Sequence, residues 1–83
     1  MNNEMLNRLR PIVATYAQNK EALDTITEDT DFIKDLKINS ANLVDVVLDI
    51  EEEFDIEIDN ESMEQMLNVR IALSVIEAKL KLK

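Results

Sequence analysis

The chain has 83 residues and a net charge of −9; 46% of its residues are hydrophobic, 4% are aromatic, and cysteine and histidine are absent. The missing residue types exclude disulfide bonds, cysteine-ligated zinc, histidine acid/base catalysis and a serine–histidine–aspartate triad. A chain this short buries a thin core without space for a large catalytic cleft, so we expect one domain over residues 1–83 that is a carrier, an adaptor or an inhibitor and not an enzyme.

The N-terminal segment predicts an amphipathic helix and no targeting signal. It starts with the polar sequence MNNEMLNRLR. No apolar run approaches the ~20 residues of a membrane span, so a cytoplasmic protein is expected. Pro11 interrupts the helical pattern, so the helix either bends there or begins near it. The apolar residues that recur at helical spacing are Met5, Leu6, Leu9, Ile12, Val13, Tyr16 and Ala17.

Residues 18–37 lack a sustained hydrophobic period and predict a long loop. Threonine and aspartate side chains in this segment compete for local backbone hydrogen bonds, which disfavours a helix. We expect one turn over residues 32–36. The apolar residues available to anchor the loop are Leu23, Ile26, Phe32, Ile33 and Leu36.

Residues 40–54 form the clearest predicted helix. Its polar side chains leave one exposed strip, formed by Asp45, Asp49, Glu52 and Glu53. Apolar residues cover more than half of its circumference, which indicates burial against several neighbours. These residues are Leu43, Val44, Val46, Val47, Leu48, Ile50 and Phe54.

A short element over residues 61–66 and a last helix that begins after the cap Asn68 complete the chain. Glycine is absent, so turns that need a positive φ angle must use asparagine or aspartate, which favours helices joined by loose loops. We therefore predict an all-α fold, a small antiparallel bundle of three main helices plus one short helix.

The negative charge is concentrated in the middle of the chain. Residues 38–69 contain ten acidic residues and no lysine or arginine, whereas the rest of the chain has eight acidic and nine basic residues. Such a surface repels nucleic acid and attracts basic patches on proteins. The alternative is that these acidic side chains only keep a helix soluble.

Ser40, at the start of the predicted helix, has two interpretations. Asn39 and Ser40 are both good N-cap residues, so the serine could be a structural cap. It could also carry a phosphate group, because free backbone N–H groups and the positive end of the helix dipole lie at a helix N-terminus. Another enzyme would have to attach that group, since nothing in the sequence can activate the hydroxyl.

The stretch DLKINSANLVDVVLDIEEEFDIEI resembles the modification site of acyl carrier proteins, where a serine at the start of the second helix receives phosphopantetheine. TDFIKDL and MEQML on either side also match the family, so the resemblance covers about residues 26–78. It implies that a phosphopantetheinyl transferase attaches the arm to Ser40. The arm would carry acyl intermediates as thioesters in fatty-acid, polyketide or related lipid biosynthesis.

The resemblance also implies two groups of site residues. Asp45, Glu51 and Glu52 would dock on basic patches of acyl-transferring, condensing and reducing enzymes. A monomer that binds no nucleic acid is expected. An interior that shelters an acyl chain would be lined by Val47, Ile50, Met63, Met66 and Ala72, for which an ordinary hydrophobic core is the alternative.

Four residues near Ser40 differ from the family's pattern. Asn39 and Ala41 stand where the family has aspartate and leucine, Lys37 replaces a glycine, and Asn42 replaces an acid. These changes remove a charge and an apolar contact that a modifying enzyme could use. We therefore expect a general-purpose transferase to modify this chain slowly, which favours a specialised carrier.

The alternating acidic residues Asp55, Glu57, Asp59 and Glu61 raise the alternative of a calcium-binding loop. An EF-hand loop that starts at Asp55 would place Asn60 at the glycine position and Met66 at the position of the bidentate glutamate, so no metal site is predicted. An unmodified acidic adaptor that docks a basic protein is an alternative, and so is an aminoacyl or peptidyl carrier.

Overall fold

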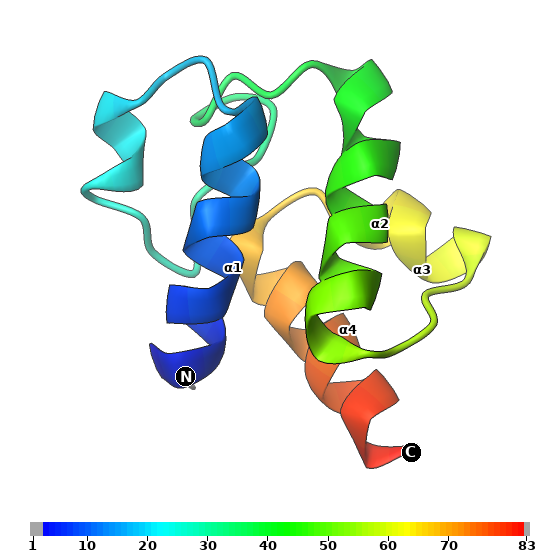
Figure 1. The fold of residues 1–83 in the computed structure, drawn as a ribbon. Helices are drawn as coiled ribbons and strands as arrows, with labels where there is room; N and C mark the ends of the chain where they lie inside the picture. Colours follow the sequence, from blue (N-terminus) through cyan, green and yellow to red (C-terminus); the bar gives the residue numbers. More distant parts are fainter. Residues whose placement is uncertain (1–2, 83) are drawn as a thin grey trace.

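The computed structural model describes residues 3–82 and has the predicted all-α architecture (Figure 1). Three long helices and one short helix are joined by irregular segments, as expected for an acyl-carrier-like bundle. An isolated bridge between Asp31 and Asn68 is the one β-type pairing among the described residues. The helices are α1 (Asn3–Tyr16), α2 (Leu43–Phe54), α3 (Asn60–Gln65) and α4 (Val69–Lys81), and 3₁₀ turns occupy η1 (Glu21–Leu23) and η2 (Ser40–Asn42).

Helix α1 runs through Pro11 without ending. The helix begins at Asn3, so the alternative that it starts near the proline is wrong. Pro11 lacks an N–H group and therefore costs the helix one backbone hydrogen bond. The apolar stripe on both sides of it remains buried, because Leu9 and Val13 are each 0% exposed. Burial of this stripe stabilises the helix more than the lost hydrogen bond destabilises it.

The segment between α1 and α2 is a long connection, as predicted, and backbone hydrogen bonds attach it to both ends of the bundle. The Gln18 and Asn19 N–H groups donate to the Leu36 carbonyl, each over 3.1 Å. The Phe32 N–H donates to the Leu67 carbonyl at 3.0 Å, and the Ile38 N–H donates to the Phe32 carbonyl at 3.0 Å. The segment therefore has a defined path up to the start of α2.

The predicted anchors of this connection are confirmed in part. Ile26, Phe32 and Leu36 are buried in the hydrophobic core, and Leu23 packs partly buried against it. Ile33 is 37% exposed and does not anchor the segment. It lies in the turn that follows Asp31, where consecutive side chains cannot all point inward.

Side-chain caps fix where the later helices begin. Asp59 caps α3, because its carboxylate accepts a hydrogen bond from the Ser62 N–H. Asn68 caps α4 by accepting from the Ile71 N–H at 2.9 Å, which confirms the predicted cap. Helix α2 ends at Phe54, and its C-cap Asp55 has a left-handed φ of 54°, as expected where aspartate replaces glycine.

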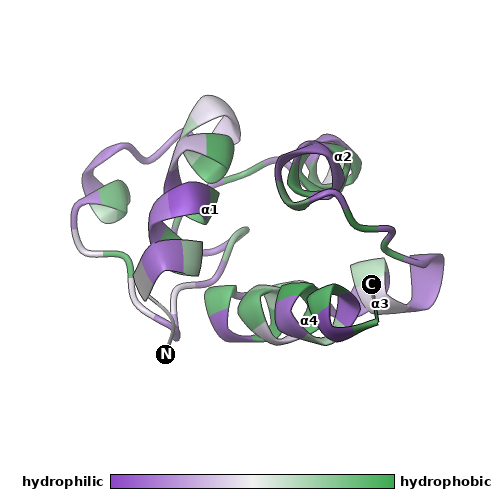
Figure 2. Cartoon of the chain, turned by 60° about the horizontal axis from the view of Figure 1, so that its bottom comes forward, coloured by the Kyte–Doolittle hydropathy of each residue, from purple (hydrophilic) through white to green (hydrophobic). Residues whose placement is uncertain are grey.

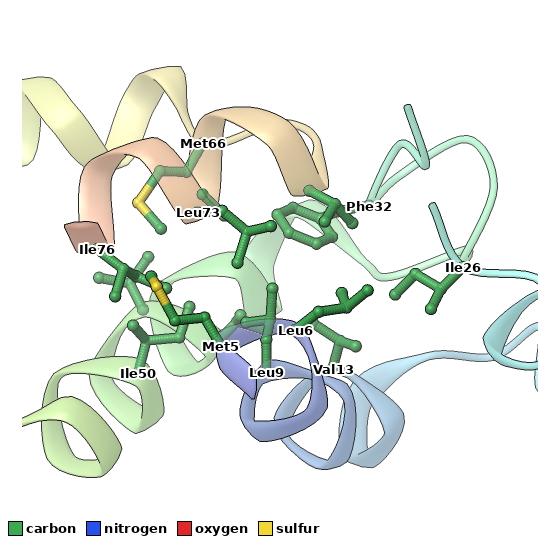
Figure 3. Close-up of a cluster of buried hydrophobic side chains, with 14 of the residues drawn as sticks. Met5, Leu6, Leu9, Val13, Ile26, Phe32, Ile50, Met66, Leu73 and Ile76 are labelled. Carbon is green, nitrogen blue, oxygen red and sulfur yellow. The ribbon is translucent and has the colours of Figure 1, made fainter. Parts of the chain in front are cut away.

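The core lies between α1, α2 and α4, with the connecting segment closing one side (Figure 3). Hydrophobic and hydrophilic residues alternate along each long helix in Figure 2, as an amphipathic pattern requires. Within residues 3–82, none of the helices combines the length and the apolar character that crossing a membrane requires. The fully buried large side chains are Leu9, Val13, Phe32, Leu36, Ile38, Val46, Ile50, Val69 and Ile76.

Candidate functional site

Ser40 is exposed at the start of η2, which leads directly into α2. Its Oγ atom makes no hydrogen bond to any residue between positions 3 and 82. The N-cap is Asn39, whose side-chain Oδ1 accepts a hydrogen bond from the Ala41 N–H at 2.9 Å. The interpretation of Ser40 as the cap is therefore wrong, and its hydroxyl has no structural task.

The backbone N–H groups after Ser40 are already in use. The Ala41 N–H donates to the Asn39 side chain, and the Asn42 N–H donates to the Asn39 carbonyl at 2.8 Å. The expectation that several free N–H groups surround a phosphate at this position is therefore not met. The Ser40 hydroxyl is exposed, and η2 contains no acidic residue. A phosphodiester at this position would therefore meet no like charge within η2.

The residue three positions before Ser40 has an unusual backbone. Lys37 has a φ of 58°, in the left-handed region that glycine adopts without strain. Buried side chains flank it, since Leu36 is 0% and Ile38 is 1% exposed. The conformation is therefore imposed by the packing on both sides of the lysine.

The three acidic residues expected to dock partner enzymes are not equivalent. Asp45 and Glu52 are exposed on α2. Glu51 is half-buried, and its Oε2 accepts a hydrogen bond from the Ile58 N–H at 2.7 Å. Glu51 therefore holds the loop after α2 against the helix, a contact that its sequence neighbours do not indicate.

Sequence reasoning missed two apolar members of the same surface. Val44 is 47% and Leu48 is 54% exposed, so the prediction that both belong to the buried side of α2 is wrong. The helical period explains the difference, because positions three and four apart share a face and Leu48 lies between Asp45 and Glu52. The exposed face of α2 is thus apolar and acidic together. The spacing of three and four residues from Asp45 and Glu52 is the sequence signal that indicates this mixed face.

The five residues expected to line an interior cavity are members of the core or contact it. Val47, Ile50, Met66 and Ala72 are buried, and Met63 packs partly buried against them. Figure 3 shows Ile50 and Met66 turned toward the same cluster of side chains. The largest surface hollow has none of the five in its lining, which consists of Glu51, Asp55, Ile56, Glu57, Ile58, Asp59, Lys79 and Leu82.

Two side chains of α1, Arg8 and Tyr16, make polar contacts with α2 and fix how the acidic helix is presented. The Arg8 Nε donates to Glu53 Oε2 at 2.9 Å, and the guanidinium lies 4.2 Å from the centre of the Phe54 ring. The Tyr16 hydroxyl donates to Asp49 Oδ2 at 2.8 Å. This hydrogen bond and the nearby negative charge raise the pKa of the Tyr16 hydroxyl above its usual value.

An ion pair joins the loop before α3 to the end of α4. The Lys79 ammonium lies 2.9 Å from Asp59 Oδ1, and the Ser62 hydroxyl donates to the same oxygen at 2.8 Å. The lysine first and the serine second lower the pKa of the Asp59 carboxyl well below its usual range. The described residues gather no group of three side chains that could hold a metal ion.

The chain matches known proteins both as a member of a family and as a single related sequence. The family model described as "Phosphopantetheine attachment site" matches residues 7–74, a range that includes the start of α2. An acyl carrier protein of Lactobacillus acidophilus is 33% identical over 75 residues, which are 90% of this chain and 91% of that protein. The similarity therefore extends over nearly the whole length of both chains.

Proposed function

Because this chain belongs to the acyl carrier protein family and has its phosphopantetheine attachment domain, we propose that Ser40 is the residue that carries the arm. Proteins of this family are carriers and not catalysts, and their prosthetic group is covalently attached phosphopantetheine. In this proposal residues 1–83 act as one carrier domain. Acyl intermediates are held as thioesters on the thiol of the arm.

The observation that carries the proposal is the state of the Ser40 hydroxyl. It is exposed, it makes no hydrogen bond within residues 3–82, and it lies where the connecting segment turns into α2. Modification at this position replaces only the hydroxyl proton, so no native hydrogen bond of the side chain is lost. The described residues offer no base that contacts the hydroxyl, so the phosphopantetheinyl transferase must take up this proton.

The exposed face of α2 is proposed as the surface that partner enzymes bind. Asp45 and Glu52 supply charge for basic patches, and Val44 and Leu48 supply apolar area beside them. Glu51 belongs to this surface only through its exposed part, since its carboxylate also accepts from Ile58. We assign the partners to acyl-transferring, condensing and reducing enzymes of fatty-acid, polyketide or related lipid biosynthesis.

The proposed shelter for the acyl chain is the interior between α2, α3 and α4. Met66 and the partly buried Met63 lie on the α3 side of the core, and methionine side chains adapt readily to a new neighbour. Ile50 and Val47 form the opposite wall on α2. Ala72, on α4, has the smallest side chain of the five, so an acyl chain would displace the least side-chain volume there. An acyl chain would enter by parting these side chains.

The experiment is the intact mass of the protein after co-expression with a phosphopantetheinyl transferase. We expect a mass gain of one phosphopantetheine group in the wild type and none in Ser40→Ala. Ser74→Ala is the matched control, because Ser74 is also exposed and lies on α4. A mass gain that persists in Ser40→Ala would refute the assignment of the residue.

The rival function is an acidic adaptor that docks a basic protein without a prosthetic group. It predicts no mass gain with several different transferases, and unchanged partner binding in Ser40→Ala. An aminoacyl or peptidyl load would give the same mass gain in the unloaded carrier as an acyl load. Mass spectrometry of the loaded arm, recovered from the native host, separates these two kinds of cargo.

A further inference from the structure

Lys37, which lies three residues before Ser40, is positively charged, whereas all charged residues from 38 to 69 are negative. Residues 38–69 contain no basic residue, yet the charged residue nearest to Ser40 in sequence is Lys37. The first acidic residue after the serine is Asp45, in the first turn of α2. A group attached to Ser40 is therefore flanked by a cation upstream and by neutral side chains downstream.

The residues next to Ser40 in the sequence have no negative charge. Asn39, Ala41 and Asn42 are neutral, and Lys37 is a cation. A phosphodiester on Ser40 therefore meets no carboxylate from its immediate neighbours in the chain, and Lys37 is a potential counter-ion for it.

The left-handed backbone at position 37 is one that a glycine would also adopt. What the lysine adds at this position is therefore its charged side chain. The φ of 58° suits glycine, and a side chain in this region meets a steric penalty. Hydrogen bonds hold the residues on both sides, from Gln18 and Asn19 to the Leu36 carbonyl and from Ile38 to the Phe32 carbonyl. Lys37 is therefore held at a fixed, exposed point of the surface.

The Lys37 ammonium has no partner of its own in the described chain. It takes part in none of the ion pairs formed between residues 3 and 82, whereas Lys79 pairs with Asp59 and Lys81 lies near Glu77. Three residues of chain span at most about 10 Å. A lysine side chain and a phosphodiester on serine can together bridge that distance.

Resting on the carrier function proposed above, we propose that the Lys37 ammonium pairs with the phosphodiester that joins the prosthetic arm to Ser40. The lysine is a positioning residue, because it holds the first bonds of the arm toward the connecting segment. The face of α2 that contains Asp45 and Glu52 then stays open for partner enzymes.

The test compares the apo and holo forms of three proteins: the wild type, Lys37→Asn and Lys34→Asn. Asparagine tolerates the left-handed conformation, so Lys37→Asn removes the charge and keeps the backbone. Lys34→Asn removes the same charge from an exposed position in the same connecting segment. The first measurement is the thermal unfolding midpoint of each form, from which we take the holo value minus the apo value. The second is the ³¹P resonance of the phosphodiester, which depends on the groups around it.

We expect this holo-minus-apo difference to be lower in Lys37→Asn than in the wild type by about 1–8 °C at low salt, the scale of one exposed ion pair. At ~0.5 M salt, which screens the ion pair, Lys37→Asn and the wild type should have the same holo-minus-apo difference. Lys34→Asn should match the wild type. The ³¹P resonance should move in Lys37→Asn alone.

Equal holo-minus-apo differences and an unmoved ³¹P resonance in all three proteins would overturn the proposal. A Lys37→Asn protein that is loaded slowly but is otherwise unchanged when loaded would also overturn it, since the lysine would then contact the transferase. Absence of any mass gain at Ser40 would instead refute the carrier function itself. The two failures are therefore distinguishable.

Discussion

Replacing Asn39 separates its structural task from its effect on loading. In Asn39→Ala the side-chain acceptor of the Ala41 N–H is lost, whereas the backbone carbonyl still accepts from the Asn42 N–H. In Asn39→Asp a carboxylate oxygen can replace Oδ1, so the cap is kept. A negative charge is also added near the positive end of α2. We therefore expect the two variants to change stability in opposite directions.

The size of the effect follows from the single hydrogen bond of 2.9 Å between Asn39 Oδ1 and the Ala41 N–H. Replacing an N-cap asparagine by alanine costs roughly 0.5–2 kcal/mol, with ~1 as the central value. For a domain of this size, 1 kcal/mol lowers the unfolding midpoint by about 4–8 °C. A carboxylate near a helix N-terminus stabilises by about 0.3–1 kcal/mol at low salt, so Asn39→Asp should raise the midpoint by a few degrees.

Thermal unfolding followed by circular dichroism at pH 7 measures both changes. Asn42→Ala is the control, because the Asn42 side chain makes no capping hydrogen bond, and it should stay within about 0.5 kcal/mol of the wild type. If Asn39→Asp were destabilised as much as Asn39→Ala, the side-chain acceptor would not be the source of the stability. Equal effects of Asn39→Ala and Asn42→Ala would lead to the same conclusion.

Three further predictions concern loading, docking and titration. Asn39→Asp should speed loading by a general-purpose phosphopantetheinyl transferase about 1.4- to 5-fold, the effect of one exposed ion pair, and an unchanged rate would show that the missing acid does not limit loading. Asp45→Lys should slow turnover by partner enzymes at low salt and much less at high salt, and a salt-independent effect would contradict electrostatic docking. Tyr16 is the one tyrosine and tryptophan is absent, so absorbance near 295 nm follows its hydroxyl alone. Asp49→Ala should bring the raised pKa of Tyr16 down toward its ordinary value, and no change would rule out the contact with Asp49 as its cause.

The lowered pKa of Asp59 predicts how stability depends on pH. The carboxyl binds protons less readily in the folded than in the unfolded chain, so its contribution is fully present above the unfolded pKa of 3.8 and is lost as the pH falls from there through the lower pKa of the folded chain. Unfolding midpoints of the wild type and Asp59→Asn should therefore differ by a constant amount from pH 7 to 5 and converge in more acidic solution. A difference that persists at the lowest pH would contradict this origin.

The elements that sequence predicted well are those specified by local signals. Asn68 caps α4 because an asparagine before an apolar run can accept from the N–H group three residues later. The buried side of α2 follows from the spacing of Val46, Val47 and Ile50. These features require only neighbours within one or two turns, so the order of residues contains them.

The features that were missed depend on contacts between distant segments. Nothing near Glu51 in the sequence indicates that it accepts from Ile58, because the loop after α2 must first turn back. The left-handed φ of Lys37 is set by the packing of Leu36 and Ile38, and lysine itself has no preference for it. The choice of Asn39 and not Ser40 as the cap also depends on the path of the connecting segment.

The hydrogen bonds between the connecting segment and the start of α4 also bear on the timing of modification during synthesis. The Val69 N–H donates to the Thr30 carbonyl at 3.0 Å, and the Arg70 N–H donates to the Glu28 carbonyl at 2.9 Å. The connecting segment before Ser40 therefore gains these two hydrogen bonds only when the chain extends past residue 70. If the transferase proposed above recognises this path, it will load complete chains in preference to chains that end before α4.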